Sequence, residues 1–317
     1  MPGWYGISTL DYFTSDEKWF DANLKAIETF PDIIFLPGFW AEYGMCTEPS
    51  AFGAKPIWHP DNMPHAQKII HSTEEVDDLS KPDPKTDGLL PFVINRMKNC
   101  YPRIKKIRHD LKFATTRGPL NIASFLMGAT EFLMLLKTSP QKAHKLLDII
   151  TEFLIDWLNL QKKTFPSIEG IFVLDDILGF IGDQDFKEFA LPYLKKIYSV
   201  FKAKINFLHN DADGQITANH LNEIGVNLFN FAFKHGIDEI QKLTNGKVAM
   251  LGNIPPRDVL ANGTSEDIEN AVSDVLKRKD EKTRLILSCG GGMPLGVSTE
   301  NIKILLHCVN ANTTAPQ

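Results

Sequence analysis

The sequence has few cysteines, no concentrated positive charge and no long apolar runs. Four cysteines in 317 residues cannot build a disulfide framework, so we expect reduced thiols. Lys and Arg (34) are outnumbered by Asp and Glu (39) and interspersed with them, which excludes the basic stripe of a nucleic-acid-binding protein. No apolar run reaches membrane-spanning length. The segment Met1–Gly6 lacks the basic region and apolar core of a signal peptide. We therefore expect a cytoplasmic protein that binds neither nucleic acid nor membrane.

Short β-rich runs alternate along the chain with longer amphipathic stretches. Several of the runs are almost wholly apolar, as strands buried on both faces are. Seven strands are predicted, at Ile33–Pro37, Lys112–Thr116, Gly170–Asp175, Lys204–His209, Val226–Phe231, Lys247–Gly252 and Arg284–Cys289. Helices are predicted between them, including Thr130–Leu136, Pro140–Lys162, Asp185–Lys202 and Ser265–Lys279.

This order of elements predicts an α/β fold with a mainly parallel sheet covered by helices. The chain length of 317 residues suits a (β/α)₈ TIM barrel. The eighth strand either lies in the first thirty residues or is absent, and an open doubly wound sheet is the alternative. The segment 55–88, rich in Pro, His and Asp, is predicted to be an excursion on the barrel rim. Residues 1–317 are then one barrel domain.

The ends of two predicted strands carry side chains that suit a metal ion. In a parallel barrel, functional groups lie at the C-terminal ends of the strands. His209 and Asp211 are spaced i, i+2, so their side chains share a face if the strand continues. Cys289 ends a later strand, before the turn Gly290–Gly292, where a ligand can approach the backbone. Three such ligands and an open fourth position are typical of catalytic zinc. Alternatively, His209 is a rim histidine hydrogen-bonded to Asp211, and Cys289 is an ordinary buried thiol.

Other strand ends offer catalytic candidates. Asp175 and Asp176 could act as a general acid or base or orient a ligand. The alternative is that one of them caps a helix or bonds the loop backbone. Arg117 could clamp an anionic group with two hydrogen bonds, or form a salt bridge to a carboxylate on the rim.

The loop after the first predicted strand is a candidate for substrate binding. Its aromatic residues Phe39, Trp40 and Tyr43 could line an apolar pocket, although aromatic residues also serve simple packing. Glu42 lies on the same glycine-containing loop, which could close over a substrate. Asn253, at the end of the sixth predicted strand, is a further candidate for substrate contact.

Four stretches of the chain resemble the uroporphyrinogen decarboxylase superfamily, and the resemblance extends from Ile33 to the C-terminus. They are similar to its Gly-x-Pro segment, its Asp-containing strand end with the following Phe-x-Glu-Phe-x-x-Pro-Tyr helix, its Gly-Asn-hydrophobic-x-Pro strand end and its terminal glycine turn. The matching stretches are Arg117–Phe125, Leu174–Asp176 with Phe186–Tyr193, Leu251–Pro256, and Gly290–Pro294 with Glu300–Asn301. The resemblance implies a (β/α)₈ barrel.

Within that superfamily, the site pattern is more similar to the cobalamin-dependent methyltransferases than to the decarboxylases. The chain lacks the arginine-rich N-terminal motif of the decarboxylases and has Gly291 where they carry a histidine. His209 and Cys289 match zinc-ligand positions of the methyltransferases, and Asp211 stands where a cysteine is expected. The resemblance thus implies zinc, a small methylated substrate (O-, N- or S-methyl) or a thiol, and a corrinoid supplied by a partner corrinoid protein. A metal-free decarboxylase or lyase, and a non-catalytic binding module, are the alternatives.

Overall fold

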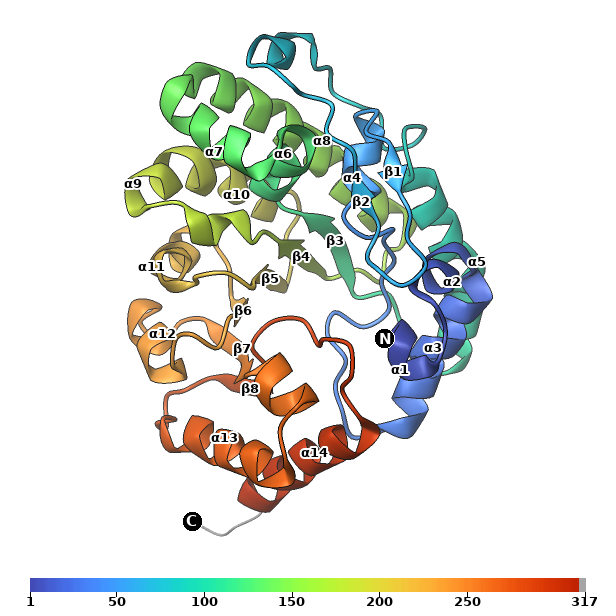
Figure 1. Cartoon of the computed structure of the whole chain (residues 1–317), viewed down its shortest axis with the longest axis vertical. Helices are drawn as coiled ribbons and strands as arrows, with labels where there is room; N and C mark the ends of the chain where they lie inside the picture. The colour runs from blue at the N-terminus through green and yellow to red at the C-terminus, as the bar shows by residue number, and fades with distance from the viewer. Residues whose placement is uncertain (314–317) are drawn as a thin grey trace.

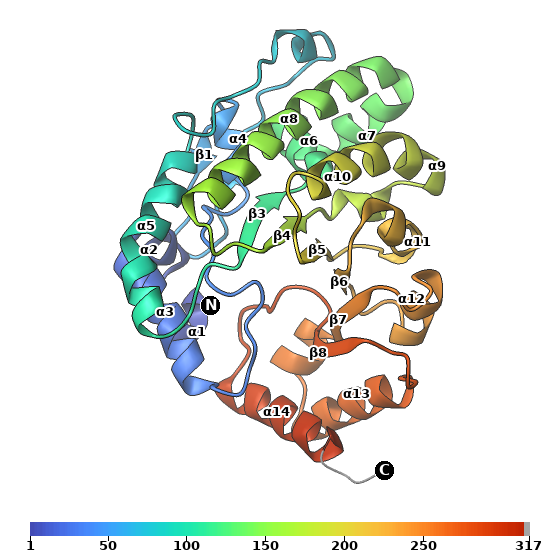
Figure 2. The same cartoon turned by 180° about the vertical axis from the view of Figure 1, so that it is seen from behind.

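A six-stranded parallel sheet forms the centre of the protein. The structure, a computed structural model, describes residues 1–313, and its sheet has the order β3-β4-β5-β6-β7-β8. The strands are β3 (Phe113–Arg117), β4 (Gly170–Leu174), β5 (Ile205–Asn210), β6 (Leu228–Phe231), β7 (Ala249–Ile254) and β8 (Leu285–Cys289). They follow a curve with the helices on the outside (Figure 1), as the view from behind also shows (Figure 2). The predicted α/β fold of the TIM-barrel type is confirmed, with six parallel strands formed among residues 1–313 rather than the eight of a complete (β/α)₈ barrel.

Helices follow most strands and cover the outer face of the sheet. They are α5 (Leu90–Lys106), α6 (Pro119–Met127), α7 (Ala129–Thr138), α8 (Pro140–Thr164), η2 (Ile177–Phe180), α9 (Asp183–Asp185), η3 (Phe186–Ala190), α10 (Leu191–Tyr198), α11 (Gln215–Ile224), α12 (Ile237–Leu243), η4 (Pro256–Ala261), α13 (Ser265–Lys277) and α14 (Thr299–Thr313). Local sequence fixes their ends. For example, Thr264 and Asp267 form a reciprocal capping box that begins α13.

The N-terminal part of the chain is helical and irregular. It contains α1 (Pro2–Tyr5), α2 (Thr9–Thr14), α3 (Asp16–Thr29) and α4 (Thr47–Ala51). The predicted strand Ile33–Pro37 is wrong, because residues 33–37 have no strand conformation. Pro37 has no backbone N–H to give to a ladder, and Gly38 turns the chain with a φ of 84°. The segment instead crosses the space between β8 and β3 (Figure 1).

The side chains inside the barrel form a core of their own. Phe113, Phe172, Phe207, Leu228 and Leu251 make this cluster, and Leu36 from the irregular segment packs against it. The rings of Phe172 and Phe207 stack with their centroids 4.3 Å apart. Because side chains alternate along a strand, residues two positions further on face the mouth of the same interior. The barrel is therefore packed below its C-terminal rim, and polar groups are confined to that rim.

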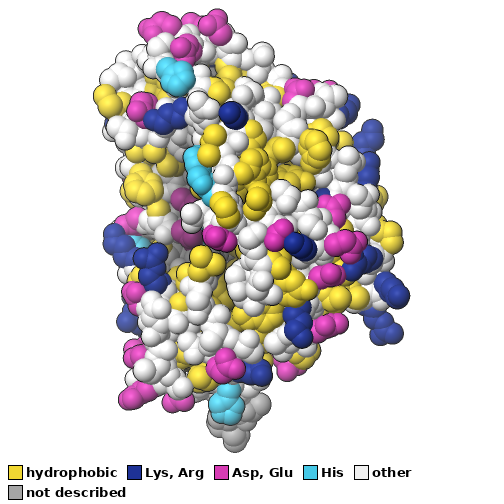
Figure 3. Space-filling model, turned by 45° about the vertical axis from the view of Figure 1, so that its right-hand side comes forward, with side chains coloured by type: hydrophobic (Ala, Val, Ile, Leu, Met, Phe, Trp, Pro, Cys, Tyr) yellow, Lys and Arg dark blue, Asp and Glu magenta, His cyan; other side chains and the backbone are white. Residues whose placement is uncertain are grey.

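The excursion 55–88 lies outside the sheet. It contains the short antiparallel pair β1 (Pro56–Ile57) and β2 (His65–Ala66) and the turn η1 (Glu74–Asp78). On the face in Figure 3, acidic and basic side chains are mixed around hydrophobic ones. Among residues 1–313, no single helix has the length and hydropathy to cross a membrane. Helices α6 and α7 have the required length and hydropathy only when taken together, and the chain bends by 107° between these two helices.

Candidate metal centre

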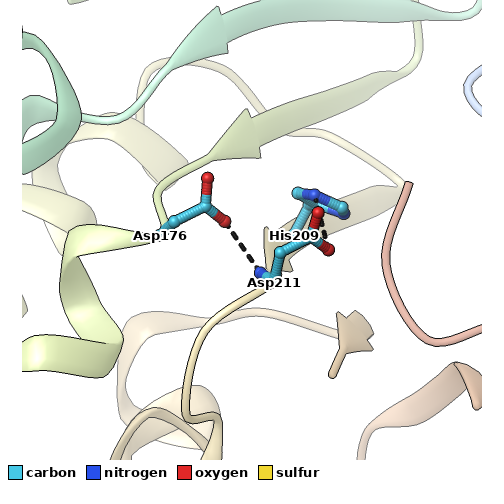
Figure 4. A group of neighbouring side chains, drawn as sticks. All are labelled: Asp176, His209 and Asp211. Atoms are coloured by element: carbon cyan, nitrogen blue, oxygen red, sulfur yellow. Dashed lines mark hydrogen bonds and ion pairs between the residues drawn. The ribbon is translucent and has the colours of Figure 1, made fainter. Parts of the chain in front are cut away.

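His209 and Asp211 meet at the C-terminal end of β5. His209 is the penultimate residue of the strand, and Asp211 follows its last residue. The two side chains point the same way, as the i, i+2 spacing predicts, with 3.1 Å between His209 Nε2 and Asp211 Oδ1. His209 is mostly buried, with a side chain 12% exposed, whereas that of Asp211 is 45% exposed. The pair therefore faces the barrel mouth, with the carboxylate on the outer side (Figure 4).

Asn230 on the neighbouring strand β6 decides which nitrogen of His209 carries the proton. The amide nitrogen of Asn230 donates to the carbonyls of Leu251 and Cys289, at 2.6 and 3.2 Å. Its Oδ1 must then be the atom 2.7 Å from His209 Nδ1, and an amide oxygen can only accept. In the neutral imidazole the proton therefore lies on Nδ1. Nε2 keeps its lone pair, as a metal ligand requires.

Asp176, predicted as a catalytic residue, completes a group of three possible ligands. Among the described residues, ligand atoms of Asp176, His209 and Asp211 lie within 4.8 Å of one another. Asp176 Oδ1 accepts a hydrogen bond from the backbone N–H of Asp211 at 2.7 Å (Figure 4). The side-chain oxygen of Asn121 in turn accepts from the N–H groups of Asp176 and Ile177, at 3.1 and 3.2 Å. These contacts hold the end of β4 against the end of β5.

Cys289, predicted as the third zinc ligand, lies at the end of β8 outside this group of described residues. Its thiol donates to the carbonyl of Gly291 at 3.0 Å. Burial raises the pKa of the thiol, and the negative charge of Asp211 adds to this effect. The sulfur of Cys289 does not lie within 4.8 Å of the ligand atoms of both His209 and Asp211.

The glycine turn after β8 forms the wall beside Asp211. The N–H of Gly292 donates to Asp211 Oδ2 at 3.3 Å. A Cβ on Gly291, where φ is 108°, would lie only 2.5 Å from Asp211 Oδ1. The sequence indicated that these glycines let a ligand approach the backbone, and the group that approaches is the carboxylate of Asp211.

Asp175, the other predicted acid or base, is fully buried and faces away from the mouth. Its two carboxylate oxygens accept from the backbone N–H groups of Leu120 and Asn121, at 3.0 and 3.1 Å. Both donors belong to the first turn of α6, so Asp175 satisfies N–H groups that the helix itself cannot. Burial raises the pKa of Asp175 well above its usual value, although these two N–H groups favour the charged form.

Arg117, at the end of β3, is held between two glutamates. Its Nη2 donates to Glu42 Oε2 at 2.8 Å, and both side chains are mostly buried. Glu48 Oε1 accepts from the backbone N–H of Arg117 at 2.9 Å and from the hydroxyl of Thr116 at 3.1 Å. The guanidinium is thus already paired with a carboxylate, which was the alternative to an anion clamp.

The residues predicted to contact substrate are mostly packed. Phe39 is 3% exposed and stacks on Phe20, whereas Trp40 lies edge-on against Phe172 of the barrel interior. Tyr43 is also buried, beneath the guanidinium of Arg96. The amide nitrogen of Asn253 donates to the carbonyl of His235 at 2.6 Å. Their role in substrate binding stays a prediction.

Electrostatics in the site favour a charged pair. Burial lowers the pKa of His209, but the hydrogen bond and charge of Asp211 and the charge of Asp176 outweigh burial and raise it. Burial raises the pKa of Asp211, but its bonds to His209 and Gly292 and the charge of Arg117 outweigh that effect and lower it. Without an ion, the site therefore tends toward imidazolium and carboxylate. A divalent cation would replace the proton on Nε2.

Sequence reasoning missed Asn230 and did not place Asp176 among the possible ligands. Asn230 lies in an apolar strand, Leu228–Phe231, where a single buried amide is the only signal of a special role. Asp176 followed a strand next to the one bearing His209, and parallel strands end at the same rim. That adjacency could have indicated a shared site.

Comparison with known proteins agrees with this fold. Residues 5–312 match the family model for uroporphyrinogen decarboxylase (URO-D), so the chain belongs to the URO-D family. The uroporphyrinogen decarboxylase of Pseudoalteromonas translucida is 24% identical over 282 residues, covering 83% of this chain and 75% of that protein. The one from Myxococcus xanthus is 25% identical over 264 residues, covering 80% and 73%.

Among solved structures, a methyltransferase from Methanosarcina mazei has a similar fold. The TM-score is 0.81 at 17% sequence identity, and the match covers 98% of this chain and 89% of the other. At this identity the likeness establishes the fold. The family is one of enzymes, and the curated relatives in it carry the name uroporphyrinogen decarboxylase.

Proposed function

We propose that the protein is a zinc-dependent methyltransferase. It moves a methyl group between a small methylated substrate, or a thiol, and a corrinoid carried by a partner protein. One observation carries the proposal: three possible ligands, Asp176, His209 and Asp211, converge at the barrel mouth, and Asn230 leaves Nε2 of the imidazole free to bind an ion.

The donor atoms fit zinc. Imidazole nitrogen and carboxylate oxygen are both common zinc ligands. Two ligands with bonds of about 2.1 Å stand roughly 3.4 Å apart in a tetrahedral site. The 3.1 Å between His209 Nε2 and Asp211 Oδ1 is close to that spacing. The third ligand is either Cys289, as predicted from the sequence, or Asp176, which the structure brings nearer.

A bound zinc ion would act as a Lewis acid on the substrate heteroatom and stabilise a leaving thiolate or alkoxide. The protein's own residues prepare this chemistry. Asn230 keeps the proton of His209 on Nδ1. Asp176 uses Oδ1 to hold the backbone of Asp211, so its second oxygen is the candidate to accept a proton from a thiol or alcohol.

The rim of the barrel offers a surface for a corrinoid protein. Four large hydrophobic side chains are exposed on loops that follow β4, β6 and β8. They are Phe180, Phe233, Met293 and Leu295, which are 64, 48, 48 and 67% exposed. Exposed apolar side chains around a polar mouth are typical of interaction sites. A partner seated there would cover the mouth and exclude water from the transfer.

The alternative, metal-free decarboxylation, is favoured by the names of the sequence relatives. It would need a cationic side chain to hold the carboxylates of the substrate. Arg117 already pairs with Glu42, and Glu48 holds its backbone. A substrate carboxylate would have to displace Glu42 from a mostly buried ion pair, so we favour methyl transfer.

Metal analysis of the purified protein tests the proposed centre. We expect about one zinc per chain, and none in His209→Ala. His220→Gln is a matched control, because His220 also pairs with an aspartate, Asp183, at 2.7 Å but lies away from the mouth. Cys289→Ser and Asp176→Asn identify the third ligand by which of them loses zinc. If His209→Ala retains as much metal as His220→Gln, the centre does not exist.

A spectroscopic assay tests methyl transfer separately. Methylcobalamin is mixed with simple thiols and the zinc-loaded protein, and demethylation of the corrinoid is followed by its visible absorbance. We expect turnover that disappears in His209→Ala and persists in His220→Gln. Zinc binding with decarboxylation of a porphyrinogen, and no demethylation with any thiol or methylated donor, would refute the methyltransferase.

A further inference from the structure

A small cavity lies beside Arg117, behind the proposed metal centre. It has a volume of about 10 Å³ and is bounded by the loop that carries Glu42 and Glu48, by β3 and by α8. That volume is about what one water molecule requires. None of the residues proposed to bind the metal lines it.

Four of the residues that line this cavity each carry a buried polar atom without a protein partner. The atoms are Glu48 Oε2, Thr115 Oγ1, Arg117 Nε and Trp157 Nε1, and no hydrogen bond to another described residue satisfies them. All four residues are at least nine-tenths buried, with 4, 8, 9 and 2% exposure. Buried polar groups are nearly always paired, so four unpaired ones around one cavity indicate a guest that pairs with them.

We infer that this cavity is a binding site for one ordered water molecule. The nitrogens of Arg117 and Trp157 can only donate. Glu48 accepts when ionised, and the hydroxyl of Thr115 can accept or donate. A water molecule accepts two hydrogen bonds and donates two, which matches this set. It would accept from Arg117 and Trp157 and donate to Glu48 and Thr115.

The charges around the cavity favour a neutral guest. Arg117 is already balanced by Glu42, whose Oε2 lies 2.8 Å from Nη2. A halide would therefore add an uncompensated negative charge beside two glutamates. A cation would face two N–H donors.

A neighbouring cavity gives an internal comparison. It has a volume of about 20 Å³ and is lined mainly by apolar side chains such as Val93, Met97 and Phe165. The amide of Gln161 also borders it, but its oxygen and nitrogen are both bonded to the backbone of Thr115, at 2.9 Å each. Thr115 borders this larger space as well as the first. Among the residues that line the larger space, only Thr115 has an unpaired polar atom, which is fewer than the two to four partners that a water needs, so we expect this space to stay dry.

The water would bridge three elements of the fold that are not joined by a ladder of backbone hydrogen bonds. Glu48 lies in the first turn of α4, Thr115 and Arg117 belong to β3, and Trp157 lies on α8. By bonding Nε, the water fixes the guanidinium plane of Arg117. It thereby holds in place the positive charge that helps to lower the pKa of Asp211.

A high-resolution crystal structure of the whole protein tests the site directly, in chloride and in bromide. We expect one density peak within hydrogen-bond distance of at least three of the four atoms, without anomalous signal in bromide, and none in the apolar cavity. An anomalous peak would show a halide and overturn the proposal. So would side chains that pair with each other and close the space, or water only in the apolar cavity.

Matched variants test the site in solution. Thr115→Val removes one partner of the water without changing the side-chain shape. Thr151→Val removes another buried hydroxyl that lacks a partner, but one that does not line the cavity. We expect Thr115→Val to lower the melting temperature by about 2 °C, and Thr151→Val to leave it unchanged or raise it. If Thr115→Val behaves as Thr151→Val does, no water bridges these groups.

Discussion

Replacing Asn230 by leucine should weaken zinc binding while leaving every proposed ligand in place. Asn230 makes three hydrogen bonds, one to His209 Nδ1 at 2.7 Å and two to the carbonyls of Leu251 and Cys289. Leucine has the same branching and number of side-chain heavy atoms and makes none of these hydrogen bonds. Without an acceptor on Nδ1, the imidazole loses both its preferred tautomer and its fixed ring orientation. Partners of this kind change metal affinity by about 10- to 100-fold, or roughly 1.4–2.8 kcal/mol.

The two buried carbonyls allow a second, separable effect to be calculated. Each loses its N–H donor in Asn230→Leu, and an unpaired buried group costs about 1–3 kcal/mol. We therefore expect the free energy of unfolding of the zinc-free protein to fall by about 2–6 kcal/mol. Asn230→Asp is the matched variant, since it keeps an oxygen toward Nδ1 but no longer donates to the carbonyls. It should bind zinc within about threefold of the natural protein and still be destabilised.

Competition with a chromophoric chelator measures the zinc affinity, and urea unfolding of the zinc-free protein measures stability. We expect the two variants to differ in zinc affinity and to resemble each other in stability. Equal zinc affinities for Asn230→Leu and the natural protein would show that the bond to Nδ1 does not control the imidazole. Equal losses of affinity in both variants would show that the carbonyls, rather than His209, transmit the effect.

Three further outcomes follow from the site. Gly291→Ala should destabilise the protein by at least about 1 kcal/mol and displace Asp211, because the new Cβ would lie 2.5 Å from Asp211 Oδ1. Gly296→Ala is the control and should keep zinc, because Gly296 has a similar φ and no atom lies within 4 Å of its Cβ position. Unfolding curves and metal content check both variants. Asp175→Asn should cost about 1–3 kcal/mol in urea unfolding, since one N–H at the start of α6 loses its acceptor, without loss of zinc from a properly folded sample. Zinc affinity should rise with pH and level off above the pKa of His209, because below that pKa a proton competes with the metal for Nε2. Since the pKa of His209 is raised, the midpoint of this rise should lie above 6.5, the usual pKa of histidine. Chelator competition across pH measures the midpoint, and a value well below 6.5 would contradict the prediction.

Most of the fold could be predicted from the sequence because its strands are short, apolar and separated by amphipathic helices. The six predicted strands from Lys112 onward all correspond to β3–β8. The first failed because Ile33–Pro37 has the composition of a strand but not its hydrogen bonds. Its side chains serve the core all the same, since Leu36 packs into the barrel interior. Apolar composition therefore reported burial, and it did not distinguish a strand from an extended segment.

The candidate site was only partly predictable, for a physical reason. The i, i+2 spacing of His209 and Asp211 is a local property, so the sequence contained it. The closeness of Asp176 and Asn230 depends on the register of β4 with β5 and of β5 with β6, which pairs Leu174 with His209 and His209 with Asn230. No spacing along one chain encodes that register. The orientation of the Cys289 thiol likewise depends on the glycine turn.

Residues 33–37, the irregular segment between β8 and β3, interrupt the hydrogen bonding around the ring of strands. No ladder hydrogen bonds join residues 33–37 to either flanking strand in the described part of the chain, so nothing there fixes a register. Residues can be added or removed on this side without shifting the alignment of His209 with Asn230. The length of this segment is thus not tied to the register that places His209 beside Asn230, whereas its packing is tied to Leu36 and to the pair of Glu42 with Arg117.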